Sequence, residues 1–513
     1  MLNKGILLIG ITLLAACNSS NKNVEQKNKS AYSELEGEQL ARNYCSGCHD
    51  FPKVEILPRD YWGRVLPIMG FFLGMGRDKY MFADYLNPVA RERLSASGLF
   101  PESPLMSIEK WIAINNYYLH NSPLELHVEE TLQFDMDLKQ FSVESLPWKS
   151  THEGLSYLNF DNGQYELGFY NERESYYIKL DDRGRELQKT KITSPLVDVS
   201  KKNNGELLLL MGKLNNIDEP TGEILSKTDS LQQLIYPLER PINFEVEDFD
   251  NDGVDDILVA EFGKFLGGIN IYTRKDTIRK LKIHSGSGPV KTIVKDVNND
   301  GLKDFYVLIA QADESVYLFL NTGNLNFDKK RLLRLPAHYG TTNFELLDFD
   351  GDGDDDLICS SGDSGDYGMV LKPFHGIRLF ENLGDDQYEQ VWFHTQQGAY
   401  GTASADYDND GDIDIASIGY SASYLNKDKE LFIYFENQSN KNEKWRFKPH
   451  GYQGNANDCW ILITSADVDN DGDLDVLLGA NSKILNQEAK DIKSIEWREQ
   501  GGMVTVLKNN LIK

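Results

Sequence analysis

One acidic motif occurs five times between residues 248 and 475, and it limits the possible folds of the 513-residue chain more than any other feature. Each copy reads Asp-x-Asp/Asn-x-Asp-Gly-x-x-Asp, and the copies begin at Asp248, Asp296, Asp348, Asp406 and Asp467. Successive copies lie between 48 residues (248 to 296) and 61 residues (406 to 467) apart. A motif that recurs at such a spacing indicates tandem structural units of one kind.

The order of oxygens within each copy is typical of a calcium-binding loop. Side chains at positions 1, 3 and 5 face one centre, glycine at position 6 permits a sharp turn, and a carbonyl at position 7 and a carboxylate at position 9 complete the ligand set. An EF-hand begins in the same way, but these loops close on Asp at position 9 and lead into an apolar, β-rich run. We therefore expect up to five Ca²⁺ ions, with one charge fewer at the copy that contains Asn298.

The expected calcium ligands share these five positions of the motif. They are Asp248, Asp250, Asp252, Val254 (carbonyl) and Asp256; Asp296, Asn298, Asp300, Leu302 (carbonyl) and Asp304; Asp348, Asp350, Asp352, Asp354 and Asp356; Asp406, Asp408, Asp410, Asp412 and Asp414; and Asp467, Asp469, Asp471, Asp473 and Asp475.

The sequence around the acidic loops predicts a β-propeller over residues 145–513. Apolar runs such as 257–260 and 476–479 follow the loops, and units of this length, rich in β-branched and aromatic residues, suit four-stranded blades. Two units that have lost the carboxylates, near residues 159–169 and 198–211, raise the expected number of blades to seven, with six or eight as the alternatives. The segment 503–507 is expected to supply the last strand.

A second motif, Cys45-Ser46-Gly47-Cys48-His49, lies near the other end of the chain and is the C-x-x-C-H of covalent c-type haem attachment. One helical turn brings the two thiols to the two haem vinyl groups, and the imidazole of His49 then faces the iron. Zinc is disfavoured because no second Cys pair follows. We expect one haem c.

The segment 35–122 resembles a small class I cytochrome c domain, a small all-α fold. It carries the haem motif, a Trp-containing segment that ends in Met69, and a last helix near residues 107–119. The resemblance implies that a methionine is the second axial ligand, since Met is common at this position. Met69 is favoured and Met75 is the main alternative. Residues 123–144 are expected to be a linker.

The first 34 residues have the features of an exported lipoprotein. A short apolar run, 6–14, ends in Leu14-Ala15-Ala16-Cys17, which resembles a bacterial lipobox. The resemblance implies cleavage after residue 16, lipidation of Cys17, and a flexible polar tether over residues 17–34, which anchors the protein in the bacterial cell envelope. Asn18 follows Cys17 in place of an acidic residue associated with inner-membrane retention, which favours the outer membrane, on its periplasmic or surface face.

The net charge of −27 argues against nucleic acid as a partner, because phosphates require Lys and Arg. Cys359 and Cys459 are isolated in apolar surroundings and are expected to be small buried residues instead of a disulfide.

His284, His338 and His394 each precede an acidic loop. They could form a ring that holds a ligand, but the favoured interpretation is that each is a turn residue with a structural hydrogen bond. Lys372 and His375 carry the same two interpretations. No nucleophile elbow, zincin or nucleotide-loop motif is present.

The acidic loops resemble FG-GAP/VCBS repeats of integrin-like propellers, and the whole arrangement resembles bacterial lipoproteins that join a cytochrome c to such repeats. The resemblance implies an anchored electron-transfer protein with a redox partner protein and a propeller that binds a protein or glycan. Two alternatives remain. In one, the propeller oxidises a sugar or alcohol and reduces the haem. In the other, the protein is an adhesin or lectin-like binder. Whether it is an enzyme stays open, although the absence of a catalytic motif argues against one.

Overall fold

The computed structural model describes residues 32–75, 88–128, 135, 137–150, 154–202, 205–214, 218–311, 313–363, 370–420, 431–440, 443–452, 459–481 and 503–511. The export signal and Cys17 lie outside the described residues. Helices lie before residue 122 and strands after residue 140. The helices are α1 (Glu34–Cys45), the 3-10 helix η1 (Val54–Ile56), α2 (Arg59–Phe72), α4 (Pro88–Ser97) and α5 (Ile108–Asn121). None of the described helices is both long and apolar enough to cross a membrane.

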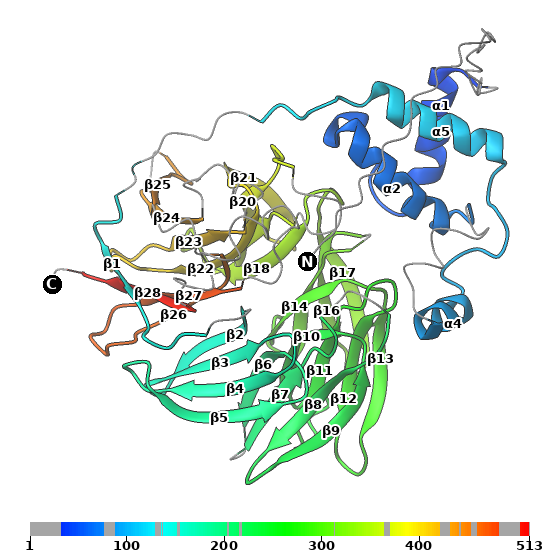
Figure 1. Cartoon of the computed structure of the whole chain (residues 1–513). Helices are drawn as coiled ribbons and strands as arrows, with labels where there is room; N and C mark the ends of the chain where they lie inside the picture. Colours follow the sequence, from blue (N-terminus) through cyan, green and yellow to red (C-terminus); the bar gives the residue numbers. More distant parts are fainter. Residues whose placement is uncertain are drawn as a thin grey trace, which may run out of the picture.

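Helices α1, α2 and α5 pack around one apolar cluster. Ser33 caps α1 in a capping box with Glu36, and Ser107 caps α5. Gly37 permits a close crossing of α1 and α5, because a Cβ atom there would lie 2.8 Å from the carbonyl oxygen of Ala113. The fully buried ring of Tyr118 lies 4.2 Å from that of Trp62, which joins α5 to α2. Figure 1 shows these three helices beside the β-structure.

The β-structure consists of seven four-stranded antiparallel sheets. In spatial order within each sheet, the strands are β2 (Gly154–Asp161), β3 (Gln164–Tyr170), β4 (Ser175–Leu180) and β5 (Glu186–Ile192); β6 (Leu196–Lys202), β7 (Gly205–Leu210), β8 (Gly222–Lys227) and β9 (Leu231–Leu238); β10 (Pro241–Glu247), β11 (Asp256–Glu261), β12 (Gly268–Thr273) and β13 (Arg279–Ser285); β14 (Pro289–Lys295), β15 (Asp304–Ile309), β16 (Ser315–Asn321) and β17 (Phe327–Arg334); β18 (Thr341–Leu347), β19 (Asp356–Ser361), β20 (Gly376–Asn382) and β21 (Tyr388–Thr395); β22 (Ala399–Ala405), β23 (Asp414–Gly419), β24 (Phe432–Asn437) and β25 (Phe447–Gly451); and β26 (Trp460–Ala466), β27 (Asp475–Ala480), β28 (Val504–Asn509) and β1 (Phe141–Ser145).

The sheets form a closed seven-bladed β-propeller, which confirms the predicted fold and blade number (Figure 1). The first strand of each blade contacts the first strand of the next, and β26 contacts β2 to complete the ring. Each of these inner strands has a break in register near its start, as between Pro241 and Asn243 in β10. Such bulges strengthen the local twist that a narrow ring requires. We number the blades one to seven, starting with β2–β5.

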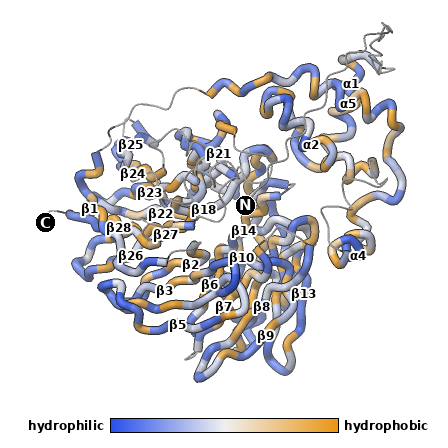
Figure 2. Tube along the Cα trace, viewed as in Figure 1, coloured by the Kyte–Doolittle hydropathy of each residue, from blue (hydrophilic) through white to orange (hydrophobic). Residues whose placement is uncertain are grey.

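Burial explains why the chain forms these blades. Strand β11 and its counterparts β15, β19, β23 and β27 are buried at every residue, so they read as continuous apolar runs. The outermost strand β13 is mostly exposed, as are β5 and β17. In Figure 2 hydrophobic segments recur along the strands, as this packing requires.

Blade seven is closed by two distant parts of the chain. Strand β28 is its third strand, and β1 pairs with β28 from Phe141↔Asn509 to Ser145↔Thr505. The segment 503–507 supplies β28, the last strand along the chain, as predicted, and β1 from the predicted linker occupies the outer edge of this sheet. The propeller sheet thus begins at Phe141, inside the stretch 123–144.

We expect Phe141→Ala to test this closure. Phe141 is 5% exposed, and its ring lies 5.2 Å from that of Tyr434 and 5.9 Å from that of Tyr407 in the neighbouring blade. Its removal should lower the free energy of unfolding by about 3 kcal/mol, measured by urea unfolding. Val143→Ala on the same strand, where the side chain is 37% exposed, should cost less than about 1 kcal/mol. Equal losses would mean that β1 is not held by this contact.

Candidate functional site

Each acidic loop joins the first strand of a blade to its second strand, in blades three to seven. In blade three, the two oxygens of Asp248 accept the main-chain N–H groups of Asp252 at 3.1 Å and Gly253 at 2.8 Å. The same bonds recur from Asp296, Asp348, Asp406 and Asp467. Position 6 is a glycine with φ between 85° and 100°, a conformation that favours glycine. All five loops therefore have one backbone shape.

Carboxylates converge in four of the five loops. Ligand-type oxygens lie within 4.8 Å of one another in the sets Asp248, Asp250 and Asp256; Asp348, Asp350 and Asp356; Asp406, Asp408 and Asp410; and Asp467, Asp469 and Asp475. Burial, followed by the charge of the neighbouring carboxylates, raises the pKa of Asp256 to about 7 and that of Asp356 to about 6. Acids held this close repel one another unless a cation or protons intervene.

The side chain at position 7 was missed by the sequence analysis, which assigned only the carbonyl there. In three loops this residue is an aspartate, and one buried oxygen each of Asp354, Asp412 and Asp473 has no hydrogen-bond partner among the described residues. Burial and the neighbouring acids raise the pKa of Asp412 to about 7. Lysines approach some of these loops from outside, as Lys444 does at 2.6 Å from Asp350 and Lys275 at 3.0 Å from Asp252.

The aspartate at position 9 has a second, structural role. Asp475 begins β27, and its two oxygens accept the N–H of Val468 in the loop and of Asn509 in β28, each at 2.8 Å. Asp304, Asp356 and Asp414 bond the equivalent asparagines Asn321, Asn382 and Asn437. One carboxylate thus joins the acidic loop to the second and third strands of its blade.

The C-x-x-C-H motif lies at the C-terminal end of α1. Cys45 is the last residue of that helix, half-buried against the apolar cluster, and burial raises the pKa of its thiol to about 11. Cys48 is exposed, and Nδ1 of His49 lies 2.8 Å from the carbonyl oxygen of Asp50. Both cysteines carry free thiols in this structure. The thiols and the imidazole therefore share one short turn beside the apolar cluster.

The methionines considered as a second axial ligand differ in burial. Met75 and Met106 are each 6% exposed and belong to the same apolar cluster as Val65 and Ile114. Met69 is half-buried in α2 and packs against that cluster, as Cys45 does. Met81 lies outside the described residues.

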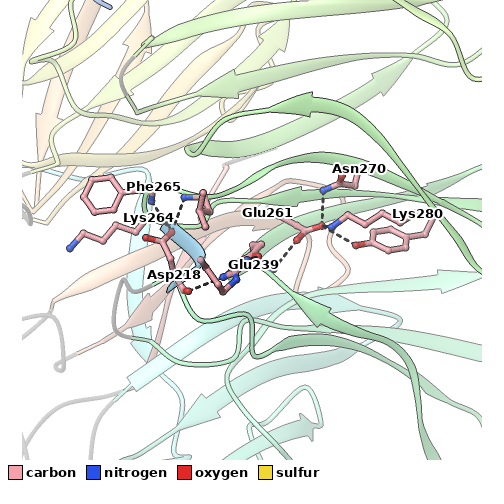
Figure 3. Close-up of polar contacts among 10 residues, drawn as sticks. Asp218, Glu239, Glu261, Lys264, Phe265, Asn270 and Lys280 are labelled. Carbon is pink, nitrogen blue, oxygen red and sulfur yellow. Dashed lines mark hydrogen bonds and ion pairs between the residues drawn. The ribbon is translucent and has the colours of Figure 1, made fainter. Parts of the chain in front are cut away.

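The helical segment docks on the propeller through aromatic and charged contacts. The ring of Phe265, between β11 and β12, lies 5.9 Å from Phe72 and 5.5 Å from Phe100. Asp218 fixes this loop, because Oδ1 accepts the N–H groups of residues 264, 265 and 266 at 2.8 to 3.1 Å (Figure 3). Arg93 of α4 donates to the carbonyl oxygen of Asp218 at 2.8 Å and pairs with Glu239.

The C-x-x-C-H turn also contacts the propeller. Asp50 forms an ion pair with Arg334 at 3.2 Å, and His49 lies close enough to His338 for its charge to lower the pKa of that residue. These contacts lie at the end of the blades where the second strand turns into the third. At the same end, the chain passes from one blade to the next. The acidic loops occupy the opposite ends, since strands in a blade alternate in direction. The propeller therefore presents acidic loops on one face and the helical segment on the other.

The histidines preceding the loops do not form a ring. His284 pairs with Ile269 and His394 with Ile377 at equivalent places in the outer strands, but His338 lies in the turn between β17 and β18. His394 stacks on Trp392, and burial lowers the pKa of all three imidazoles to about 4. This supports the structural interpretation for His284 and His394. Cys359 and Cys459 are fully buried and do not form a disulfide with each other, as expected.

A belt of polar side chains joins neighbouring inner strands. Asp198 accepts from the side chain of Asn243 at 2.9 Å, Asn243 accepts from the main-chain N–H of Thr292 at 2.8 Å, and Lys291 donates to Asn343 at 3.0 Å. These residues were not predicted from the sequence. Their constant distance from the acidic motifs could have revealed them, because Asn243, Lys291 and Asn343 each lie five residues before one.

The comparisons with known proteins give one family match and several distant structural matches. A family model described as an FG-GAP-like repeat matches residues 296–359. Among solved structures, the N-terminal domain of Nup159 is similar at 9% identity, with 74% of this chain and 98% of that chain covered and a TM-score of 0.43. BBS1N in a complex with ARL6DN is similar at 10% identity, with 71% of this chain and 94% of that chain covered and a TM-score of 0.40. A luciferin-regenerating enzyme is similar at 9% identity, with 61% of this chain and 95% of that chain covered and a TM-score of 0.35. None of the curated proteins matches the chain.

Glu245 beside the belt provides a pH-dependent prediction. Burial, and then the charges of Asp198 and Glu247, raise its pKa to about 8. The folded state thus retains a proton that the unfolded state releases above about pH 4.3, so the residue destabilises the fold increasingly up to pH 8. Glu245→Gln should therefore stabilise the protein by on the order of 2 kcal/mol at pH 8, and not at pH 4, in urea unfolding. Glu389→Gln, on an exposed position of β21, should give no such gain. A gain independent of pH would contradict this account.

Proposed function

We propose that this protein is a lipid-anchored c-type cytochrome whose FG-GAP-like propeller holds the haem-bearing segment and binds a partner protein or glycan. The observation that carries the proposal is the C-x-x-C-H turn, which ends α1 beside an apolar cluster and contacts the propeller through Asp50 and Arg334. The membrane anchor at Cys17 rests on the lipobox resemblance alone, and with it the outer-membrane location.

The residues present fit a covalent haem. Cys45 and Cys48 would form the two thioether links, and the ring of His49 would provide one axial nitrogen. Met69, or alternatively Met75, would supply the other ligand, since both belong to or pack against the cluster that includes Cys45. A haem supplies reversible one-electron chemistry, and two protein ligands leave no open position for a substrate. The apolar cluster borders the turn on the side of Cys45.

The haem assignment is tested by Cys45→Ala and Cys48→Ala, singly and together. Each thiol is expected to form one bond to the haem, so each single variant should retain weakened attachment and the double variant none. Haem staining after denaturing electrophoresis measures this. Cys359→Ala removes a buried thiol of the propeller and should leave attachment unchanged. Absence of covalent haem in protein matured in an export-competent bacterial host would refute the assignment.

Calcium is proposed for the acidic loops. Three observations support it: the shared loop shape, the converging carboxylates, and the unpaired buried oxygens of Asp354, Asp412 and Asp473. Oxygen donors of this number and kind suit Ca²⁺. Because β-strands already position the loops, the ion would mainly neutralise charge, and it would stabilise the blades in which it binds.

Chelation should therefore lower the melting temperature of the propeller. A metal that binds only the folded state stabilises it by about 2.7 kcal/mol when its concentration is a hundred times the dissociation constant. Calorimetry with calcium and with EDTA measures the difference. Asp348→Asn with Asp406→Asn should reduce it, whereas Asp386→Asn, which lies on an exposed turn and pairs with Lys330, should not. An identical melt with and without chelator would remove calcium from the proposal.

One observation favours the alternative of a substrate-oxidising propeller, namely that the C-x-x-C-H turn contacts the propeller through the ion pair of Asp50 with Arg334. In that case electrons would reach the haem from a ligand on the propeller. Anaerobic absorption spectra of the haem with added sugars or alcohols distinguish the relay protein from the substrate-oxidising propeller. Reduction of the haem by such a substrate requires an oxidising site on the propeller, whereas a relay protein alone would show no reduction.

A further inference from the structure

A buried group of cationic and aromatic residues lies where blade four meets blade five, on the face that carries the helical segment. Arg378 on β20 is 2% exposed, and His375 in the preceding turn is fully buried. Lys372 in the same turn is 8% exposed. Buried polar groups are normally paired, so each unpaired atom here requires an explanation.

The guanidinium of Arg378 is held but incompletely paired. It lies 3.8 Å from the centre of the Tyr339 ring and 4.3 Å from that of the Phe393 ring. These two cation–π contacts hold the guanidinium in place. Nη2 donates to the carbonyl oxygen of Phe374 at 2.5 Å. Nη1 is buried and has no hydrogen-bond partner in the part of the chain that the structure describes. One N–H edge of a rigid cation is thus left for another acceptor.

His375 supplies a second donor of the same kind. Its Nδ1 accepts the main-chain N–H of Gly398 at 3.4 Å, so the ring proton resides on Nε2. Burial, together with the charges of Lys372 and Arg378, lowers the pKa of the ring and keeps it neutral. Nε2 is buried and also lacks a partner among the described residues.

Arg378 has little negative charge beside it among the described residues. Glu314 is the carboxylic acid that acts on the pKa of Arg378, and its carboxylate already accepts the N–H of Thr341 at 2.7 Å and that of Gly340. Burial raises the pKa of Glu314 to about 7, which reduces its negative charge near neutrality. The positive charge of Arg378 is therefore weakly compensated by these residues, beside two N–H donors that lack acceptors.

We propose that this junction binds a small oxyanion, which accepts from Nε2 of His375 and Nη1 of Arg378. An oxyanion provides both missing acceptors and the missing negative charge, whereas a cation or an apolar ligand provides neither. The half-buried rings of His338 and Phe374 lie 4.5 Å apart, and the Phe374 ring lies 5.6 Å from that of His375. The oxyanion site is therefore on the face of the propeller that carries the C-x-x-C-H turn. The inference does not depend on the presence of haem or calcium.

Isothermal titration of the full chain with sodium acetate and with inorganic phosphate, against sodium chloride of equal ionic strength, tests the oxyanion site. Saturable binding of acetate would identify a carboxylate ligand, and saturable binding of phosphate alone a phosphate ligand. Chloride should give no saturable heat. His375→Phe keeps a ring but loses the donor, and it should weaken binding about tenfold or more. His375→Gln keeps an N–H donor and should bind within about threefold of the parent.

Arg378→Gln should also weaken binding about tenfold or more, because it removes the cation. His284→Phe alters a half-buried histidine of blade three and is the matched control that should bind normally. Should Arg378→Gln fail to fold, the two His375 variants decide the matter. Failure of the parent chain to bind either anion would overturn the proposal, and so would equal affinities of His375→Phe and the parent.

Discussion

The closure of the propeller ring is the constraint on which the rest of the structure depends. Seven inner strands contact one another in a circle, which the contact between β26 and β2 completes. Strand β1 then completes blade seven at its outer edge by pairing with β28, which lies more than three hundred residues later in the chain. The buried second strands, β11 among them, gain their apolar contacts from the blades on either side. Closure also fixes where the chain enters the propeller at Phe141, and this limits where the helical segment before it can lie.

The aspartate at position 9 connects this architecture to the acidic loops. Asp475 holds the loop and β28 together through two main-chain hydrogen bonds, while its carboxylate also belongs to the converging acids. The loop shape is thus set by protein groups, and repulsion among the carboxylates is what a bound cation would relieve. Binding to a preformed loop avoids most of the ordering cost that a disordered loop would have.

The two faces of the propeller carry opposite chemistry. The acidic loops gather negative charge on one face, in keeping with a net charge of −27. On the other face, the Phe265 loop and Arg93 hold the helical segment, and Arg378 lies buried nearby with unpaired donor capacity. The helical segment therefore lies on the same face as the proposed oxyanion site and on the opposite face from the acidic loops.

The sequence by itself determined the repeating units, the seven blades and the five acidic loops, because strand periodicity and loop chemistry are local properties written at a constant spacing. It also predicted Cys45, Cys48 and His49 as a haem-attachment motif, since those residues are adjacent. Only the tertiary structure decided that β1 completes blade seven, that Asp50 meets Arg334, and that one buried nitrogen each of His375 and Arg378 lacks a hydrogen-bond partner among the described residues. These are contacts between segments far apart in the chain, and the packing that creates them has no signature in any one stretch of sequence.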